Sequence, residues 1–441
     1  MVDKSSKRDH WNSRLGFILA CVGSAVGMGN IWLFPYKTGV NGGAAFLIPY
    51  FLFVIILGYT GVIGEMTLGR AYQSGPMGAF KKSFEKRGHG FGHIIGLIPV
   101  LGSVGIAIGY AVVVGWILRF TVGSLTGAVT GAADSGAYFG MIAGPYGSLV
   151  WHVLGLIITF AIMIMGVSSG IEKVNKFMMP AFFLLFIVLA VRVFFLPGSS
   201  AGYEFLFKPD WSLLLKPMTW VYALGQAFFS LSLAGSGTVA YGSYLSPDED
   251  IPHSAKYVAL LDTIAAMLAA MVIIPAVFAF NLEPGAGPPL MFITMPEVFK
   301  AMPAGQLFSI IFFVAVLFAG ITSLMNLFET AVETLENYFK LSRLVSIVIM
   351  AVLGFAVGVF LEDGSKLGDW MDMVSIYLIP LGALLASIVF FWVNGDDFAK
   401  EQASIGASKP LGDNFIFMGK YVFCGLTAFV FIIGLFVGSI G

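Results

Sequence analysis

Charged residues are scarce in this 441-residue sequence: Asp, Glu, Lys and Arg make up 11% of it, and 58% of its residues are hydrophobic. Soluble domains carry about 25% charged residues. There are only two cysteines, Cys21 and Cys424, and both fall within long apolar stretches, which argues against a disulfide framework. The net charge is −1 and no long basic tract occurs, so binding to nucleic acid is not expected.

Motifs of pumps and of common enzyme classes are also missing. No Walker-type phosphate loop is present, which argues against ATP-driven transport. The five histidines, at positions 10, 89, 93, 152 and 253, lack metal-ligand spacing, and no motif pairs a Ser or Cys with a buried His. The sequence therefore indicates no enzyme, no organic cofactor and no obligate protein partner.

Long uncharged stretches occupy most of the chain. A helix needs about 20 apolar residues to cross a bilayer, so each long stretch predicts one span. We expect eleven spans, in the stretches 15–36, 38–64, 88–118, 135–171, 177–196, 217–247, 253–281, 301–328, 344–361, 373–395 and 421–441. The first fourteen residues are polar and no small-residue cleavage site follows, which predicts a retained first span rather than a secretory signal.

Basic residues predict the orientation, because cytoplasmic loops retain Lys and Arg. With the N-terminus inside, only seven of the 24 basic residues fall on the outer side, namely Lys37, Arg119, Arg192, Lys208, Lys216, Lys300 and Lys366. We expect a multi-pass protein of the plasma (inner) membrane with a cytoplasmic N-terminus. Because the span count is odd, the C-terminus is expected to be extracellular or periplasmic.

The expected fold is all-α, with two sets of five spans and one extra span. We divide the chain into a cytoplasmic N-terminal segment (1–14), a first five-helix repeat (15–196), an extracellular loop (197–216), a second five-helix repeat (217–395), a cytoplasmic loop (396–412) and an eleventh span (413–441).

Two runs of weak helix formers lie in the middle of spans. The run "GSAVGMGNIWLFP" (23–35) interrupts the first span, and "SLSLAGSG" (230–237) interrupts the sixth. Matched interruptions in corresponding spans of two halves are typical of inverted-repeat transporters that bind solute at the bilayer midplane. Broken backbone in a bilayer must be shielded or line a polar cavity. The alternative is that these small residues only let helices pack closely.

Charged residues inside spans are costly and usually functional. The candidates are Glu65, Asp262, Glu329 and Glu333, with Asp372 near an outer end. Asp262 is isolated in an apolar span and we expect it to bind a cation; a helix-to-helix hydrogen bond is the alternative. We expect Glu65 to steady the broken first span by accepting hydrogen bonds from its freed N–H groups.

Several motifs resemble the neurotransmitter:sodium symporter family, in order and with family-like spacing. They are "RDHWNSRLGFILACVGSAVGMGNIWLFPY", "NGGAAFLIPY", "GEMTLGR", "GQAFFSLSLAGSG" with "YGSYL", and "LFAGITSLMN", between about residues 8 and 395. The resemblance implies the LeuT-type fold, an all-α 5+5 inverted repeat with discontinuous first and sixth spans, here with one extra C-terminal span. Eleven spans and short tails point to the prokaryotic amino-acid transporters of the family.

The resemblance implies two sodium ions beside the broken helices. One site would consist of the carbonyls of Gly23, Val26 and Ala319 and the hydroxyls of Thr322 and Ser323. These are neutral oxygens, which suit a hard cation. The other would consist of the Ala25 carbonyl, Asn30, Ser230, Asp262 and the carboxylate of the substrate. Contact between ion and substrate would couple their binding free energies.

The resemblance also implies an amino-acid substrate. Its carboxylate would meet the N–H groups of Gly27, Met28 and Gly29 at a half-helix N-terminus, together with the Tyr110 hydroxyl. Its amine would meet carbonyls of Ala25, Phe229 and Ser232, beside Ser230. Selectivity would come from Ile106, Tyr110, Phe229, Gly235, Ser323 and Leu327. Gly235 stands where several relatives carry a bulky residue, so we expect an enlarged pocket for a large hydrophobic or aromatic amino acid.

The outer gate departs from the family pattern. Leu33 stands where the family has an Arg, so its acidic partner, Asp372, loses that ion pair. We expect the outer lid to close through Phe229 over Tyr110 and through apolar contacts.

The inner gate retains Arg8, Trp11 and Tyr244 as gating residues. The usual Asp partner of the Arg is replaced by Asn337, next to Glu336. An inner-gate salt bridge is therefore not expected, and a surface pair would contribute little stability.

Gly170 and Pro180, with nine residues between them, lie in the inner half of the fifth span. Proline removes a backbone donor and glycine eases unwinding. The resemblance implies that this segment unwinds to let sodium leave; an ordinary proline kink is the alternative.

Asp262 stands where many relatives have Asn. Chloride-dependent members need an anion near Tyr50, Gln226 and Ser230, and a fixed carboxylate can replace that anion. We therefore expect transport without chloride. Asp262 would take up a proton after sodium leaves, because burial disfavours an isolated charge.

These observations predict a sodium-coupled secondary active symporter of amino acids that works by alternating access in a lipid bilayer. The alternatives are a carrier of another small amino or carboxylate solute, and a sensor of amino acid or sodium that does not transport.

Overall fold

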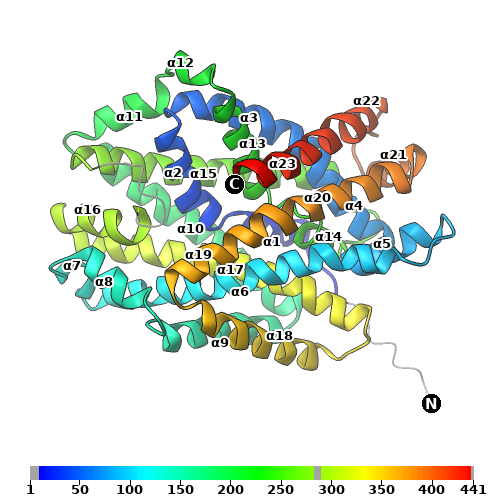
Figure 1. The fold of residues 1–441 in the computed structure, drawn as a ribbon, viewed down its shortest axis with the longest axis horizontal. Helices are drawn as coiled ribbons and strands as arrows, with labels where there is room; N and C mark the ends of the chain where they lie inside the picture. The colour runs from blue at the N-terminus through cyan, green and yellow to red at the C-terminus, as the bar shows by residue number, and fades with distance from the viewer. Residues whose placement is uncertain (1–8, 283–289, 439–441) are drawn as a thin grey trace.

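The computed structural model describes residues 9–282 and 290–438 as a bundle of helices (Figure 1). Within these ranges no β-strand occurs. Eight helical stretches are long and apolar enough to cross a membrane: Ala44–Tyr72 (α3, η2, α4), Gly92–Leu125 (α6), Val167–Phe194 (η3, α10), Ile251–Ala279 (α15), Gly305–Asn337 (α17), Arg343–Leu361 (α18, η5), Gly364–Val393 (α19, η6, α20, η7) and Asp413–Val437 (α22, η8, α23).

Three more apolar segments are shorter or broken. Arg14–Ala25 (α1) and Gly29–Val40 (η1, α2) form one span that bends by 54° at its break. Leu149–Ile164 (α9) is a short apolar helix. Pro217–Ser230 (α13) and Gly237–Gly242 (α14) are separate helices with a non-helical stretch between them, and we call them the second broken segment. Each of the eleven predicted stretches therefore contains helix. The fourth differs from its predicted bounds, because the stretch 135–171 is divided among α8, α9 and η3.

Short helices connect these segments. They are α5 (Pro76–Glu85), α7 (Ala128–Gly131), α8 (Ser135–Ile142), α11 (Ser199–Phe207), α12 (Trp211–Leu214), η4 (Leu290–Thr294), α16 (Met295–Ala301) and α21 (Asp396–Ser404). In Figure 1, α7, α8 and α16 gather at the left end of the bundle, and α5 and α21 at the right end. Following the predicted orientation, we call the left end outer and the right end inner.

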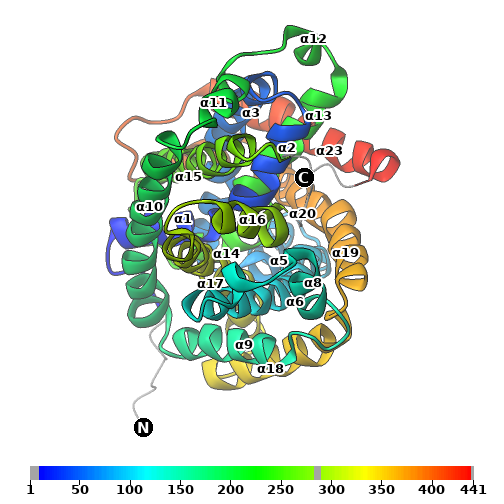
Figure 2. The same cartoon turned by 90° about the vertical axis from the view of Figure 1, so that its left-hand side faces the viewer.

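The two broken segments lie in the middle of the bundle. Figure 2, which looks toward the outer end, shows α1 and α14 surrounded by α10, α15, α20, α6 and α17. The helix α1 packs against α10, α15 and α17, and α14 packs against α4 and α17. Broken backbone is thus enclosed by protein, as a bilayer requires. The last helix, α23, lies at the edge and packs against α20.

Candidate functional site

The first break exposes backbone groups between α1 and η1. Helix α1 ends at Ala25, and Val26 is extended, with φ −74° and ψ 97°. The N–H of Met28 donates to the Tyr110 hydroxyl at 2.8 Å, and the N–H of Gly27 lies 3.3 Å from Asn30 Oδ1. Because α1 has ended and η1 has not yet begun, the N–H groups of Gly27 and Met28 and the carbonyls just before them have no partner within a helix.

The second break separates α13 from α14. Ser232 and Gly235 have positive φ angles of 53° and 66°, which stop the helix. The Ser232 hydroxyl donates to the Ser24 carbonyl at 3.3 Å, so the two breaks touch. The carboxylate of Glu65 accepts from the N–H of Gly235 at 2.8 Å. The expectation that Glu65 steadies the first span is therefore wrong: it reaches the break in the sixth, because α4 packs against α14.

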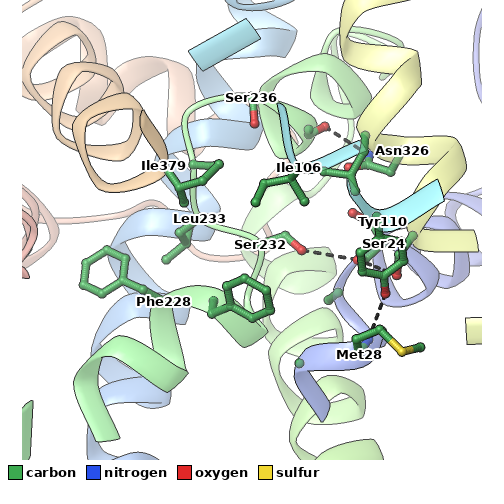
Figure 3. Close-up of a pocket in the computed structure, with 18 residues that line it drawn as sticks. Ser24, Met28, Ile106, Tyr110, Phe228, Ser232, Leu233, Ser236, Asn326 and Ile379 are labelled. Atoms are coloured by element: carbon green, nitrogen blue, oxygen red, sulfur yellow. Dashed lines mark hydrogen bonds between the residues drawn. The ribbon is translucent and has the colours of Figure 1, made fainter. Parts of the chain in front are cut away.

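A cavity lies between the two breaks (Figure 3). Its lining residues are Ser24, Ala25, Gly27, Met28, Gly29, Ile106, Tyr110, Phe228, Phe229, Ser232, Leu233, Ala234, Ser236, Gly237, Ser323, Asn326, Leu327 and Ile379. Figure 3 shows Phe228, Leu233 and Ile379 on one side, and Ser24, Tyr110 and Met28 on the other. The cavity therefore has one apolar end and one end rich in backbone and hydroxyl groups.

Ten of the twelve predicted substrate residues line this cavity; Ser230 and Gly235 do not. Sequence reasoning missed Phe228, Leu233 and Ile379. Phe228 and Leu233 lie within or beside the glycine and serine run that marks the second break, so that run could have indicated them. Ile379 has no such local signal, because it comes from α20, which is distant in sequence.

The inference from Gly235 to an enlarged pocket is wrong. A Cβ atom built at Gly235 would lie 2.4 Å from the carbonyl oxygen of Gly382 and 2.8 Å from Cβ of Ala386, both on α20. The missing side chain permits a positive φ and a close approach of backbones. It adds no space to the cavity.

Neutral oxygens converge where α17 passes the first break. The Ser323 hydroxyl lies 3.0 Å from the Gly23 carbonyl and 3.2 Å from the carbonyls of both Ser24 and Val26. One residue earlier, the Thr322 hydroxyl lies 3.1 Å from the Ala319 carbonyl. The five residues of one predicted sodium site thus lie together. The described part of the chain contains no cluster of three or more His, Cys, Asp or Glu side chains that could hold a metal ion.

Asp262 lies fully buried on α15 against both broken segments. Its Oδ1 accepts from Asn30 Nδ2 at 2.7 Å and its Oδ2 from the Ser230 hydroxyl at 2.7 Å. The Tyr50 hydroxyl donates in turn to Ser230 at 3.2 Å. Gln226 donates through Nε2 to the Gly29 carbonyl at 3.0 Å, and its buried Oε1 has no hydrogen-bond partner among the described residues. The helix-to-helix hydrogen bonds named above as the alternative role of Asp262 are thus present. They lie beside the backbone of the first break, which would bind a cation together with Asp262 in the predicted role.

The family model described as the sodium:neurotransmitter symporter family matches residues 8–136 and 142–439. The chain belongs to this family. It is similar to the uncharacterized sodium-dependent transporter YhdH of Bacillus subtilis, at 38% identity over 86% of each chain. It is also similar to an uncharacterized sodium-dependent transporter of Haemophilus influenzae, at 30% identity over 99% of this chain and 100% of that protein.

A solved structure, MhsT in complex with L-phenylalanine, is 35% identical to this chain. It aligns with 96% of this chain and 99% of its own, with a TM-score of 0.87. The symporter therefore has the LeuT-type fold expected from its motifs, and it is a multi-pass membrane protein of a sodium-coupled transporter family.

On the outer side of the symporter's central cavity lies a second one of about 560 Å³, which includes Leu33 and Asp372 in its lining. Met28, Gly29, Tyr110 and Phe229 line both cavities. A Cβ atom built at Gly29 would lie 2.7 Å from the Phe229 ring, so the ring packs directly on the glycine backbone. Phe229 therefore lies at the boundary between the cavities, where the expected lid requires it.

The inner side of the symporter is packed. The indole of Trp11 donates to the Tyr241 carbonyl at 3.0 Å, and its ring packs against the rings of Tyr241 and Tyr244. The Tyr244 hydroxyl donates to Glu329 at 2.8 Å. Arg343 in turn forms ion pairs with Glu329 at 2.8 Å and with Glu336 at 3.0 Å.

These ion pairs differ from the Arg8 gate bridge, whose absence stays a prediction. Arg343 stands outside the predicted gate motif, so the sequence gives no sign that it would reach Glu329 and Glu336. Asn337 instead donates to Glu333 at 2.9 Å. Arg8 lies outside the described residues.

The fifth span is wound in this structure. Val167–Ile171 forms a π-helix, and α10 continues from Glu172 through Pro180 to Phe194. Unwinding between Gly170 and Pro180 stays a prediction about another state of the transporter.

Proposed function

We propose that this symporter couples sodium to the transport of a large hydrophobic or aromatic L-amino acid and needs no chloride. The observation that carries the proposal is the two-ended cavity between the broken helices. Ligand pockets are typically lined by apolar side chains with a few placed polar groups, and the lining of this cavity combines the two in the same way.

The polar end suits the backbone of an amino acid. The N–H groups of Gly27, Met28 and Gly29 would receive the carboxylate, with the Tyr110 hydroxyl turning from Met28 to the same group. Carbonyls of Ala25, Phe229 and Ser232 would accept from the amine.

The apolar end suits a large side chain. Phe228, Leu233 and Ile379 would contact it, together with Ile106 and Leu327. Burying apolar area there favours binding by about 25 cal/mol per Å², so large side chains gain most. The similarity to a protein solved with L-phenylalanine supports the same size class.

Two sodium ions would be co-substrates. One ion would bind the hydroxyl oxygens of Thr322 and Ser323 and the carbonyls of Gly23, Val26 and Ala319 in one coordination shell. The ion at Ala25, Asn30, Ser230 and Asp262 would also touch the substrate carboxylate. Each ligand then raises the affinity of the other by the same factor.

Asp262 would supply the negative charge that other family members take from chloride. Its carboxylate accepts from Ser230, which accepts from Tyr50, so a fixed anion already occupies this hydrogen-bonding chain. One relative, 26% identical, is the sodium- and chloride-dependent GABA transporter 2 of Mus musculus. On the return step, with sodium gone, Asp262 would carry a proton.

Alternating access would move the halves 15–196 and 217–395 against each other around the fixed site. The outer cavity reaches Phe229 and Tyr110, while Trp11, Tyr244 and the Arg343 ion pairs fill the inner side. Arg8, Gly170 and Pro180 would act when the inner side opens. The transporter would work in the plasma (inner) membrane with a cytoplasmic N-terminus.

Uptake into proteoliposomes tests the proposal. A panel of the twenty labelled amino acids is offered under an inward sodium gradient, with chloride or gluconate as the anion. We expect accumulation of unchanged aromatic or large aliphatic amino acid, equal in both anions and abolished by a sodium ionophore. Binding without accumulation would identify a sensor, and accumulation only of glycine or other small amino acids would overturn the substrate class.

A further inference from the structure

Lys37 on α2 is a buried lysine in the outer half of the first span. Lys37 is only 8% exposed, and lysine is almost never buried without a partner. No carboxylate of the described residues lies within the 4.0 Å of an ion pair from its ammonium. Its contact is with the ring of Tyr222 on α13, whose centroid lies 4.4 Å from Nζ.

Asp372 is the complementary charge. It lies on α19, lines the outer cavity together with Leu33 and Tyr36, and likewise forms no ion pair within the ranges that the structure describes. Because Leu33 and Tyr36 line the same cavity as Asp372, the segment of the first span that carries Lys37 lies across this cavity from the carboxylate, and the two charges attract each other. The neighbouring Asp369 repels Asp372, so a cation would gain from approaching.

Helix geometry places Lys37 one turn outward from Leu33. Residues four apart lie on the same face of a helix, so the lysine occupies the face from which an Arg at position 33 would act. A lysine carries its charge on a flexible four-carbon stem, which lets the ammonium move between two partners without movement of the backbone.

Other outer cations are held elsewhere. Arg119 stacks on Tyr138 and Trp151, and Arg192 on Phe308. Lys208 pairs with Glu204 four residues earlier, and Lys300 with Glu297 three residues earlier. Lys216 is exposed, and the exposed Lys366 at the start of α19 acts on Asp363. Lys37 is thus the outer cation that acts on Asp372.

We propose that Lys37 is the outer-gate cation of this transporter. On binding of sodium and amino acid, α19 approaches α2, the ammonium leaves the Tyr222 ring, and a Lys37–Asp372 ion pair closes the outer cavity above Phe229. This inference rests on the proposed symport function, since it assumes that solute binding drives closure.

Accessibility of a cysteine in the outer cavity tests the gate. Ala143→Cys places a thiol in the cavity lining, and both native cysteines, Cys21 and Cys424, are buried, so background labelling is small. The purified protein is labelled with a bulky polar maleimide in sodium, with and without L-phenylalanine. With Lys37 intact, we expect the amino acid to slow labelling by about fivefold or more.

The gate variants are Lys37→Gln, Asp372→Asn, Lys37→Arg and the charge exchange of Lys37→Asp with Asp372→Lys, each with Ala143→Cys. With L-phenylalanine present, Lys37→Gln and Asp372→Asn should label within about twofold of the ligand-free rate. Lys37→Arg and the charge exchange should show the slow labelling of the parent. Lys216→Gln removes an exposed outer lysine and should behave as the parent does.

Sodium-dependent binding of L-phenylalanine, measured on the same samples, separates the two proposals. Loss of protection in Lys37→Gln with binding retained supports the gate. Full protection in Lys37→Gln, or none in Lys37→Arg and the charge exchange while binding persists, overturns it. Absence of sodium-dependent amino-acid binding in the Ala143→Cys parent, for the whole panel, would instead overturn the proposed function and the gate with it.

Discussion

Glu65 and Gly235 join the second span to the break in the sixth: the carboxylate Oε1 accepts from the Gly235 N–H at 2.8 Å. Both residues are inside the bundle, and Glu65 is only 3% exposed. The non-helical stretch after Ser230 frees backbone donors, and a carboxylate from α4 satisfies one of them. The "GEMTLGR" motif thereby supports the broken backbone from behind, away from the cavity.

Replacing Glu65 by Ala should destabilise the protein. The N–H of Gly235 would lose its partner inside the bundle, which costs about 1–3 kcal/mol. Thermal unfolding in detergent measures the loss. Glu204→Ala is the control, because Glu204 pairs with Lys208 at an exposed site, where an ion pair contributes little stability. Equal unfolding temperatures for the two variants would contradict this role.

Gly235→Ala should also lower stability, by about 1–3 kcal/mol, through strain at positive φ and contact with the Gly382 carbonyl. It should leave the preferred size of the amino acid unchanged in those molecules that fold, because the new methyl group points away from the cavity. Gly131→Ala, at a site with open space around the added Cβ, serves as control. A shift toward smaller substrates would refute the placement.

Ser323→Ala should raise the sodium concentration for half-maximal uptake by about tenfold, which corresponds to about 1.4 kcal/mol for one lost ligand oxygen. Titration of uptake against sodium at saturating amino acid measures this. Ser309→Ala removes a buried hydroxyl from the same helix, where it contacts Ser124, and should leave the sodium dependence unaltered. An unshifted titration for Ser323→Ala would remove this residue from the sodium site.

Asp262→Asn should make transport dependent on chloride. The amide keeps the hydrogen-bonding shape but loses the fixed charge, so an anion near Tyr50, Gln226 and Ser230 must balance sodium. We expect uptake to fall by about tenfold or more in gluconate and to recover partly in chloride. Normal saturation in gluconate would count against the proposed role of Asp262.

The sequence by itself determined the all-helical class, the eleven apolar segments, the two interruptions and the intramembrane Asp262. These properties are local: they follow from the length and apolarity of each stretch, from glycine and serine within it, and from the cost of a lone charge in a bilayer. Family motifs then indicated Tyr110, Phe229 and Ser323, and the structure brings these residues to one cavity.

Tertiary structure alone decided which distant groups meet. Glu65 supports the sixth span rather than the first, Gly235 faces α20 rather than the cavity, and Ile379 joins the apolar end. Arg343 pairs with Glu329 and Glu336 on the inner side. Such contacts join residues far apart along the chain, and they depend on how whole helices pack and rotate, which no local pattern of apolar and polar residues specifies.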